Sequence, residues 1–165
     1  MLEIKTLGKH DTILRAQCSV IPDINGGIRD FAEAMIETMH VGNGIGLAAP
    51  QVGELSRLFV VHVQGDIPRV FINPEIIGTS LEMSAYEEGC LSIPNLYYDV
   101  DRPAEVTVQA WDERGKPFTL DADGILARVI QHEYDHLKGT LFIDHLTEKK
   151  RARLLTVYNR KMQNP

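Results

Sequence analysis

The chain has 165 residues, a formal net charge of −6, 44% hydrophobic residues and 24% charged residues. This length predicts one compact domain over residues 1–165, and the ordinary composition excludes a disordered or fibrous chain. The acidic balance argues against a general nucleic-acid footprint, so no DNA partner is expected. No apolar run approaches the roughly 20 residues that span a bilayer, so no membrane partner is expected either.

Cysteine usage indicates a reducing compartment. The two cysteines, Cys18 and Cys90, are too few for a disulfide framework. Residues 1–10 alternate apolar and charged side chains and lack the apolar stretch of a signal peptide. The cytoplasm is therefore the expected location, where an isolated cysteine is free or metal-bound.

Three segments have the pattern of helices. Apolar residues recur at spacings of three and four over residues 24–40 and again over 123–138. A third helix, rich in lysine and arginine, is expected at the C-terminus over about 147–162. Polar residues that can cap these helices stand before them: Asp23 or Asn25, Asp121 or Asp123, and Thr147.

The strands are expected between the first and second helices. Runs rich in β-branched and aromatic residues, or alternating in polarity, cover residues 58–63, 70–72, 105–111 and 117–120. The second run is expected to stop at Asn73-Pro74, and the turn at 113–115 predicts a hairpin between the last two runs. Central strands with helices before and after them predict an α+β fold rather than repeated βαβ units.

The most informative segment is 131–136, QHEYDH, within the second helix. His132 and His136 are four residues apart, so they stand on one helix face and their imidazoles can bind one divalent metal. Glu133, beside the first histidine, can take a proton from a water bound to that metal. The alternative is a polar stripe on an exposed helix. Apolar residues lead into the motif and argue against that alternative, because histidines in a core need a partner or a metal.

A catalytic metal site of this kind needs a third protein ligand and an open position for water. The metzincin arrangement fails, because Phe142 stands where its third histidine belongs. The gluzincin arrangement leaves only Glu148, at an expected helix start. Cys90 is the better candidate, since it lies near a glycine and a proline in an expected bend and a thiolate is a strong ligand. The alternative for this cysteine is a small buried hydrophobic residue.

A glycine-rich segment, GNGIGLAAPQ, covers residues 42–51. It superficially matches a dinucleotide fingerprint, but that fingerprint needs a preceding strand and a following helix. Here a helix precedes the segment and Pro50 interrupts any helix after it, so the nucleotide interpretation is rejected. Glycines also allow close backbone approach to a ligand, and the Gln51 amide can donate a hydrogen bond to an oxyanion. By itself the segment is equally consistent with an ordinary loop.

Residues 44–51, 88–92 and 131–136, in this order and at these separations, resemble the signature motifs of the peptide deformylase family. The similarity covers nearly the whole chain. It implies a bacterial cytoplasmic enzyme that removes the N-formyl group from the N-terminal formyl-methionine of nascent polypeptides and releases formate. The implied fold has mixed and antiparallel β-sheets wrapped around the central helix that carries the HExxH motif, with a further helix at the C-terminus.

The resemblance also implies roles for individual residues. The metal ligands would be Cys90, His132 and His136. Glu133 would be the catalytic acid/base, while the Gln51 side-chain amide and the Leu91 backbone N–H would face the developing oxyanion. Members of the family use Fe²⁺, and related forms carry Zn²⁺, Ni²⁺ or Co²⁺.

An apolar pocket is expected to hold the methionine side chain. Gly46 and Gly89 would let the backbone approach a small formyl group. Matching positions nominate four pocket residues: Ile45, Tyr86, Ile125 and Val129. The alternative is that some of these four are ordinary core residues.

Two positions depart from the family pattern. Arg128 lies one turn before His132, where many relatives have an apolar residue, and it would either narrow or charge the pocket rim or point to solvent. Residues 95–97 follow Pro94 where a glycine and sometimes an arginine are common. Because such an arginine could pair with the motif glutamate, Glu88 is expected to have a different partner here.

Other functions compete with this interpretation. A metallopeptidase would keep the helix motif but use a different third ligand, so it predicts that Cys90→Ser changes little. A non-catalytic metal-binding or peptide-binding module has no use for Glu133. The basic helix at 147–162 either makes a transient contact with the ribosome or is a solvated helix whose Leu154, Leu155 and Val157 pack on the domain.

Overall fold

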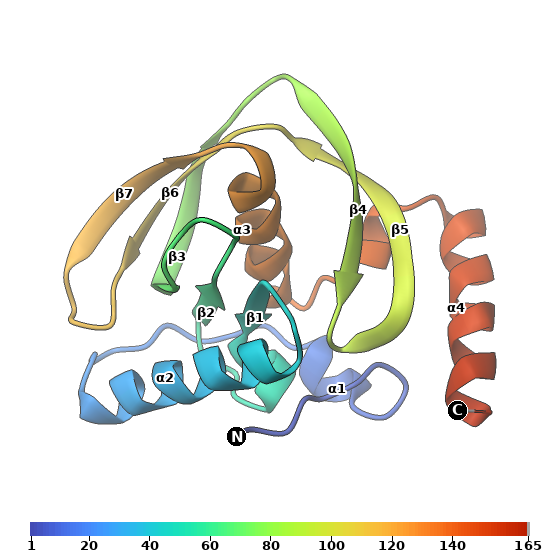
Figure 1. Ribbon diagram of the computed structural model, residues 1–165, viewed down its shortest axis with the longest axis horizontal. Coiled ribbons are helices and arrows are strands. Elements are labelled where there is room, and N and C mark those ends of the chain that lie inside the picture. Colours follow the sequence, from blue (N-terminus) through green and yellow to red (C-terminus); the bar gives the residue numbers. More distant parts are fainter. Residues whose placement is uncertain (165) are drawn as a thin grey trace.

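The computed structural model describes residues 1–164 and has an α+β architecture (Figure 1). As expected, antiparallel sheets surround a central helix, and another helix lies at the C-terminus. The helices are α1 (Asp11–Leu14), α2 (Gly26–Val41), α3 (Gly124–His136) and α4 (Glu148–Gln163), with short 3-10 turns η1 (Ala49–Val52) and η2 (Phe142–His145). The strands are β1 (Gly46–Ala48), β2 (Leu58–Val61), β3 (Arg69–Thr79), β4 (Met83–Cys90), β5 (Ile93–Pro103), β6 (Val106–Trp111) and β7 (Pro117–Ala122).

The strands form two separate sheets. Five strands pair in the order β1-β2-β3-β6-β7, and β4 and β5 form a two-stranded hairpin; all these pairs are antiparallel. Figure 1 shows α3 in the middle, with the five-stranded sheet on one side and the β4–β5 hairpin on the other. The motif-bearing helix α3 is therefore packed between the five-stranded sheet and the two-stranded hairpin.

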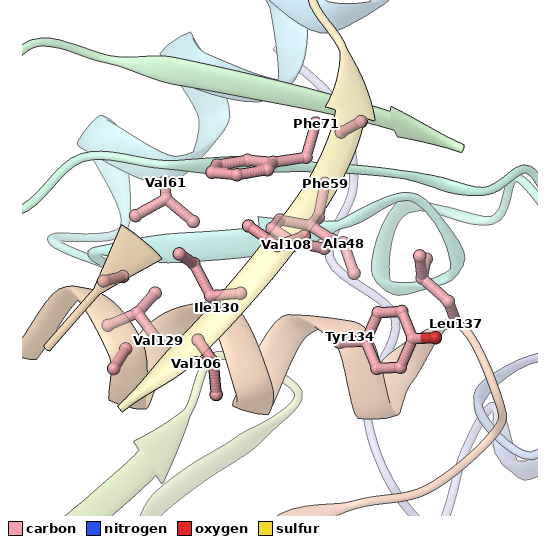
Figure 2. Packing of buried hydrophobic residues seen from close by; sticks show 13 residues of the cluster. Ala48, Phe59, Val61, Phe71, Val106, Val108, Val129, Ile130, Tyr134 and Leu137 are labelled. Atoms are coloured by element: carbon pink, nitrogen blue, oxygen red, sulfur yellow. The ribbon is translucent and has the colours of Figure 1, made fainter. Parts of the chain in front are cut away.

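Apolar side chains cover both faces of the larger sheet. Phe59 and Val61 of β2 belong to a cluster with Ile130 of α3, which Figure 2 shows. Leu58 and Val60 belong to a second cluster that includes the apolar face of α2. Because successive strand residues point to opposite faces, β2 is buried on both sides and reads as a continuous apolar run.

A third cluster joins the hairpin to α4. Tyr158 is buried there with Val100 of β5, and Leu154 and Leu155 pack against the same cluster. The prediction that these two leucines pack on the domain is confirmed. The same prediction is wrong for Val157, which is 37% exposed because Tyr158 takes the buried position of that turn.

The predicted helices are confirmed to within a few residues. Asn25 caps α2 by accepting from the Ile28 N–H at 3.1 Å, and Thr147 caps α4 by accepting from the Lys150 N–H at 3.3 Å. Asp123 precedes α3, but its side chain makes no capping hydrogen bond. Within residues 1–164, no helix has both the length and the apolar character needed to cross a membrane.

Strand β3 is longer than predicted. The expected stop at Asn73-Pro74 is wrong, because Asn73 adopts a φ of 50° and the pairing with β6 shifts register between Ile72 and Glu75. Such a bulge carries a proline through a strand that would otherwise end there. Strands β1, β4 and β5 were not predicted. Most of β4 is exposed, and its sequence, MSAYEEGC, has no apolar alternation that would signal a strand.

Candidate metal centre

Three side chains that can bind a metal meet between α3 and the end of β4. The Sγ of Cys90 and one nitrogen each of His132 and His136 all lie within 4.8 Å of one another. Cys90 ends β4 at the turn into β5, and its Sγ lies 3.4 Å from Nε2 of His136. A thiolate and two imidazoles are a donor set for a divalent transition metal, and three protein ligands leave a position open.

The two other candidates for a third ligand lie outside this group. Phe142 belongs to the apolar cluster under the hairpin, and its ring stacks on His132 with the centroids 6.0 Å apart. Glu148 is the first residue of α4, where its negative charge interacts favourably with the N-terminal end of the helix dipole. The structure therefore brings together the set that includes Cys90.

Glu88 holds the first histidine of the motif. Its Oε1 lies 2.8 Å from Nδ1 of His132, and Arg102 donates to both oxygens of the same carboxylate at 2.6 and 3.0 Å. Burial by itself would raise the pKa of Glu88, but the hydrogen bonds from His132 and Arg102 outweigh it and hold the pKa well below its ordinary value. An ionised Glu88 accepts the Nδ1–H of His132, which leaves Nε2 free to bind a metal.

The pKa values of the two histidines are shifted in opposite directions. Burial holds the pKa of His136 well below its ordinary value, which favours the neutral ring that a metal needs. Burial opposes the charged form of His132 too, but the charge of Glu133 and contacts with Cys90 and Glu88 outweigh it and raise the pKa of His132. A metal must displace that proton, so its affinity falls as the pH falls.

Glu133 stands beside the three candidate ligands as a buried carboxylate. Its Oε2 lies 3.9 Å from Nε2 of His132, and its Oε1 has no hydrogen-bond partner among residues 1–164. Burial raises the pKa of Glu133 to about 7, which suits a group that must both take and give a proton near neutral pH. A Cβ on Gly46 would lie 2.5 Å from Oε2, so the glycine of β1 leaves the space that this carboxylate occupies.

Gln51 is fixed within η1. Its Oε1 accepts from the Ala48 N–H at 2.9 Å, which leaves the amide nitrogen turned toward the hairpin. This nitrogen lies 3.3 Å from Sγ of Cys90 and 3.1 Å from Oγ of Ser92. Gln51 thus presents a donor beside the ligand group with its orientation already determined.

A cavity of about 610 Å³ opens over these residues. Its wall includes all six residues expected to bind substrate: Ile45, Gly46, Tyr86, Gly89, Ile125 and Val129. Ile45 and Tyr86 are 46% and 53% exposed, which makes them wall residues rather than core. Val129 is 4% exposed and also belongs to the apolar cluster with the larger sheet. Leu91 lines the cavity as well, directly after Cys90 in the turn.

A family model described as polypeptide deformylase matches residues 1–152. The chain belongs to the polypeptide deformylase family. It is 52% identical over 149 residues to the peptide deformylase of Borreliella burgdorferi, with 90% of each chain covered. It is 50% identical over 157 residues to that of Treponema pallidum, with 95% of each chain covered.

Solved deformylase structures share the fold. The peptide deformylase of Synechococcus elongatus, crystallised in complex with actinonin, superposes with a TM-score of 0.90 at 42% identity, covering 96% of this chain and 86% of that one. The enzyme of Legionella pneumophila gives a TM-score of 0.89 at 36% identity, covering 100% of this chain and 99% of that one.

The two departures from the deformylase pattern have local explanations. Arg128 lines the cavity but does not point to solvent, since it is 7% exposed and donates to Oε2 of Glu88 at 2.8 Å. Glu88 thus has two arginine partners, Arg102 and Arg128. Tyr97 pairs with Gly89 across the hairpin, and its ring fills the space that a Cβ on Gly89 would need.

Sequence reasoning missed the ionic cluster behind the ligands. Arg102 donates from β5 to Glu88 and also, at 2.8 Å, to Asp135 of α3. One signal was available: an arginine four residues before His132 on a largely buried helix requires a carboxylate partner. The sequence could not say which carboxylate, because Glu88 and Arg128 are 40 residues apart.

Proposed function

We propose that this chain is a metal-dependent hydrolase that removes the N-formyl group from the N-terminal formyl-methionine of newly made polypeptides and releases formate. One observation carries the proposal: a buried carboxylate with an unpartnered oxygen, Glu133, stands beside a Cys–His–His group in the wall of a cavity. Membership of the polypeptide deformylase family supports the same activity.

Cys90, His132 and His136 would hold the metal. When bound, a divalent metal would polarise the formyl oxygen and lower the pKa of a water in its open position. We propose Fe²⁺ as the native ion, following the family resemblance, with Zn²⁺, Ni²⁺ and Co²⁺ as alternatives. A thiolate with two imidazoles suits all four ions, so availability in the cell matters as much as affinity.

Glu133 would carry the proton through the reaction. It would take a proton from the attacking water and then give it to the amine that leaves, so one carboxyl acts first as base and then as acid. The pKa of about 7 that burial gives Glu133 makes both transfers accessible near neutral pH. Its unpartnered Oε1 has no competing protein hydrogen bond among residues 1–164.

Gln51 and Leu91 would stabilise the charge that develops on the formyl oxygen. The Gln51 amide nitrogen already faces Cys90, and Leu91 follows Cys90 in the turn. A donor of this kind is worth roughly 3 kcal/mol of barrier when it is held in place before the reaction. Because Oε1 of Gln51 is bound to Ala48, the side chain does not need to reorganise.

The cavity would set the substrate class. Ile45, Tyr86, Ile125 and Val129 would surround the methionine side chain. Gly46 and Gly89, both in the cavity wall, would let the backbone approach a small formyl group, and a bulky acyl group should fit badly.

The remaining expectations are part of the same proposal. Residues 1–165 would form one catalytic domain that works on nascent chains in a bacterial cytoplasm. The exposed basic residues Lys149, Arg153 and Arg160 of α4 would be available for a transient ribosome contact, because packing of this helix uses Leu154, Leu155 and Tyr158.

The test combines anaerobic purification, metal analysis and a formate-release assay on formyl-methionyl peptides. Cys90→Ser should lose or seriously weaken metal binding, whereas Cys18→Ser, at the other half-buried cysteine, should retain it. Glu133→Gln should keep the metal and lose roughly 10³-fold in turnover. Full metal content in Cys90→Ser, or unchanged turnover in Glu133→Gln, would contradict the assignment.

A further inference from the structure

Arg128 is a buried cation on the helix that carries the metal ligands. Its side chain donates three hydrogen bonds from within α3 to the hairpin: to Oε2 of Glu88 at 2.8 Å, to the Val100 carbonyl at 2.6 Å and to the Ser84 carbonyl at 2.7 Å. Ser84 and Glu88 lie on β4 and Val100 lies on β5. One guanidinium therefore ties α3 to both strands of the hairpin.

Arg128 and His132 bind the same carboxylate. They are four residues apart, so both lie on one face of α3. Arg128 donates to Oε2 of Glu88, while Oε1 of Glu88 lies 2.8 Å from Nδ1 of His132. The planar guanidinium, bonded at several points, limits how far the carboxylate can rotate or shift. The position of the His132 ring depends on that carboxylate.

The same contacts bear on the cysteine ligand. Glu88 stands two residues before Cys90 in β4, directly ahead of the turn. A carboxylate anchored to α3 therefore anchors the strand end that carries Sγ. Two of the three candidate ligands, one on each side of the site, are thus connected to Arg128 through Glu88.

Two arginines and two carboxylates form the centre of this ionic cluster, with His132 on Glu88 and His145 on Asp135. Arg102 and Arg128 are 3% and 7% exposed, and they share Glu88 and Asp135 between them. Arg102 bridges the two carboxylates, whereas Arg128 contacts Glu88 but not Asp135 among the ion pairs of residues 1–164. Without Arg128, Arg102 would be the one arginine that contacts Glu88 within residues 1–164, and Arg102 also contacts Asp135.

We infer that Arg128 is a positioning residue for the metal centre: by fixing Glu88, it keeps Nδ1 of His132 hydrogen-bonded and Nε2 turned toward the metal. This inference rests on the function proposed above. Arg128 also lines the cavity, so the competing explanation is that it merely shapes the pocket for the methionine side chain.

The test compares Arg128→Leu and Arg128→Lys with wild type. Leucine removes every donor, and lysine keeps the charge but not the planar fork that reaches several acceptors. The measurements are the dissociation constant for Co²⁺ by chelator competition, the Co²⁺ absorption spectrum, kcat and KM for a formyl-methionyl peptide, and the free energy of unfolding of the metal-free protein.

Arg128→Leu should weaken Co²⁺ binding roughly 10-fold, change the Co²⁺ spectrum and lower kcat more than it raises KM. The Co²⁺ affinity of Arg128→Lys should lie between that of Arg128→Leu and that of wild type. Gln131→Leu is the matched control, because Gln131 is also a buried polar residue of α3 that donates to β5, to the Pro103 carbonyl at 2.9 Å, without touching Glu88. It should lose stability and keep the wild-type Co²⁺ affinity and spectrum.

A rise in KM alone, with Co²⁺ affinity and spectrum unchanged in Arg128→Leu, would overturn the inference and leave Arg128 as a pocket wall. If Arg128→Leu does not fold, Arg128→Lys decides: wild-type Co²⁺ affinity and spectrum in that variant would equally overturn it. A wild-type protein that binds no metal and releases no formate would instead refute the proposed function. The two failures are therefore distinguishable.

Discussion

The two sides of α3 are held by different kinds of contact. Toward the five-stranded sheet, Val129, Ile130 and Tyr134 pack among aromatic and β-branched side chains (Figure 2). Toward the β4–β5 hairpin, Arg128 and His132 bind a buried carboxylate at fixed distances. The helix is thus packed by apolar contacts on one side and oriented by hydrogen bonds on the other.

This difference arises from the physics of the two contacts. Apolar burial is non-directional and scales with area, so it fixes where α3 lies but tolerates small changes of shape. Charged hydrogen bonds are directional and costly to leave unmade in a buried place. The sheet therefore supplies stability, and the hairpin supplies the orientation that a metal centre requires.

The sharpest test removes the carboxylate on the hairpin side. Glu88→Ala leaves Arg102 and Arg128 buried without their shared partner, so we expect a loss of about 4 kcal/mol in the free energy of unfolding. Metal affinity should fall roughly 10- to 100-fold as well, because Nδ1 of His132 loses its acceptor. Denaturant unfolding and chelator competition measure the two effects. Glu82→Ala, at an exposed glutamate beside β4, is the control, and an equal effect there would refute the comparison.

The next effect depends on pH. Burial raises the pKa of Glu133 from 4.5 to about 7, so the metal-free native state holds its proton more tightly than the unfolded state does. Below pH 4.5 Glu133 is protonated in both the native and the unfolded state. Between pH 4.5 and about 7 it ionises in the unfolded state alone, which stabilises that state. The free energy of unfolding of wild type therefore falls as the pH rises through this range. Glu133→Gln has no proton to lose, so above pH 7 it should exceed wild type by about 3 kcal/mol.

Denaturant titrations of both metal-free proteins from pH 4 to 8 measure this gain. The difference in unfolding free energy between variant and wild type should be small at the acid end and grow with pH. A constant difference across the range would show that burial does not raise the pKa of Glu133.

The sheet side has one crowded contact with the Glu133 carboxylate, for which we propose the catalytic role. Gly46→Ala places a Cβ 2.5 Å from Oε2 of Glu133 and 2.7 Å from Cγ1 of Val129, so either β1 or the carboxylate must move. We expect kcat/KM to fall roughly 100-fold while the protein stays folded. Gly78→Ala on β3, where the nearest neighbour would be 3.8 Å away, is the control. Formate release and circular dichroism measure activity and fold; wild-type activity in Gly46→Ala would contradict the crowding.

The smallest effect is expected within the apolar cluster. Ile130 is fully buried against the larger sheet, and Ile130→Val removes one methyl group there. The loss should be about 1 kcal/mol of unfolding free energy, with kcat and metal affinity unchanged. A changed Co²⁺ spectrum in this variant would show that the sheet side also orients the ligands.

The sequence was informative wherever the signal is local. The HExxH spacing placed His132, Glu133 and His136 on one helix, because the helical repeat is fixed by backbone geometry. The caps Asn25 and Thr147 were recognisable for the same reason. Family resemblance added Cys90 and Gln51, which local patterns left open.

Strand pairing and the contacts of the ionic cluster could not be predicted from local sequence patterns. Strand β4 has no apolar alternation, and its pairing with β5 joins residues as far apart as Met83 and Pro103. The contact between Glu88 and Arg128 spans 40 residues. Arg128 illustrates the limit: the sequence allowed a rim, a charged pocket or solvent, and burial under the hairpin decided among them.

By itself, then, the sequence determined the helices α2, α3 and α4, the strands β2, β6 and β7, the metal-binding motif and the family, since each depends on residue type and spacing along the chain. The tertiary structure alone decided that Glu88 orients His132, that Gly46 makes room for Glu133, and that Arg128 binds Glu88. These contacts arise where the hairpin and the larger sheet close on α3 from opposite sides. Which polar groups meet there depends on how the sheets pack rather than on any local pattern.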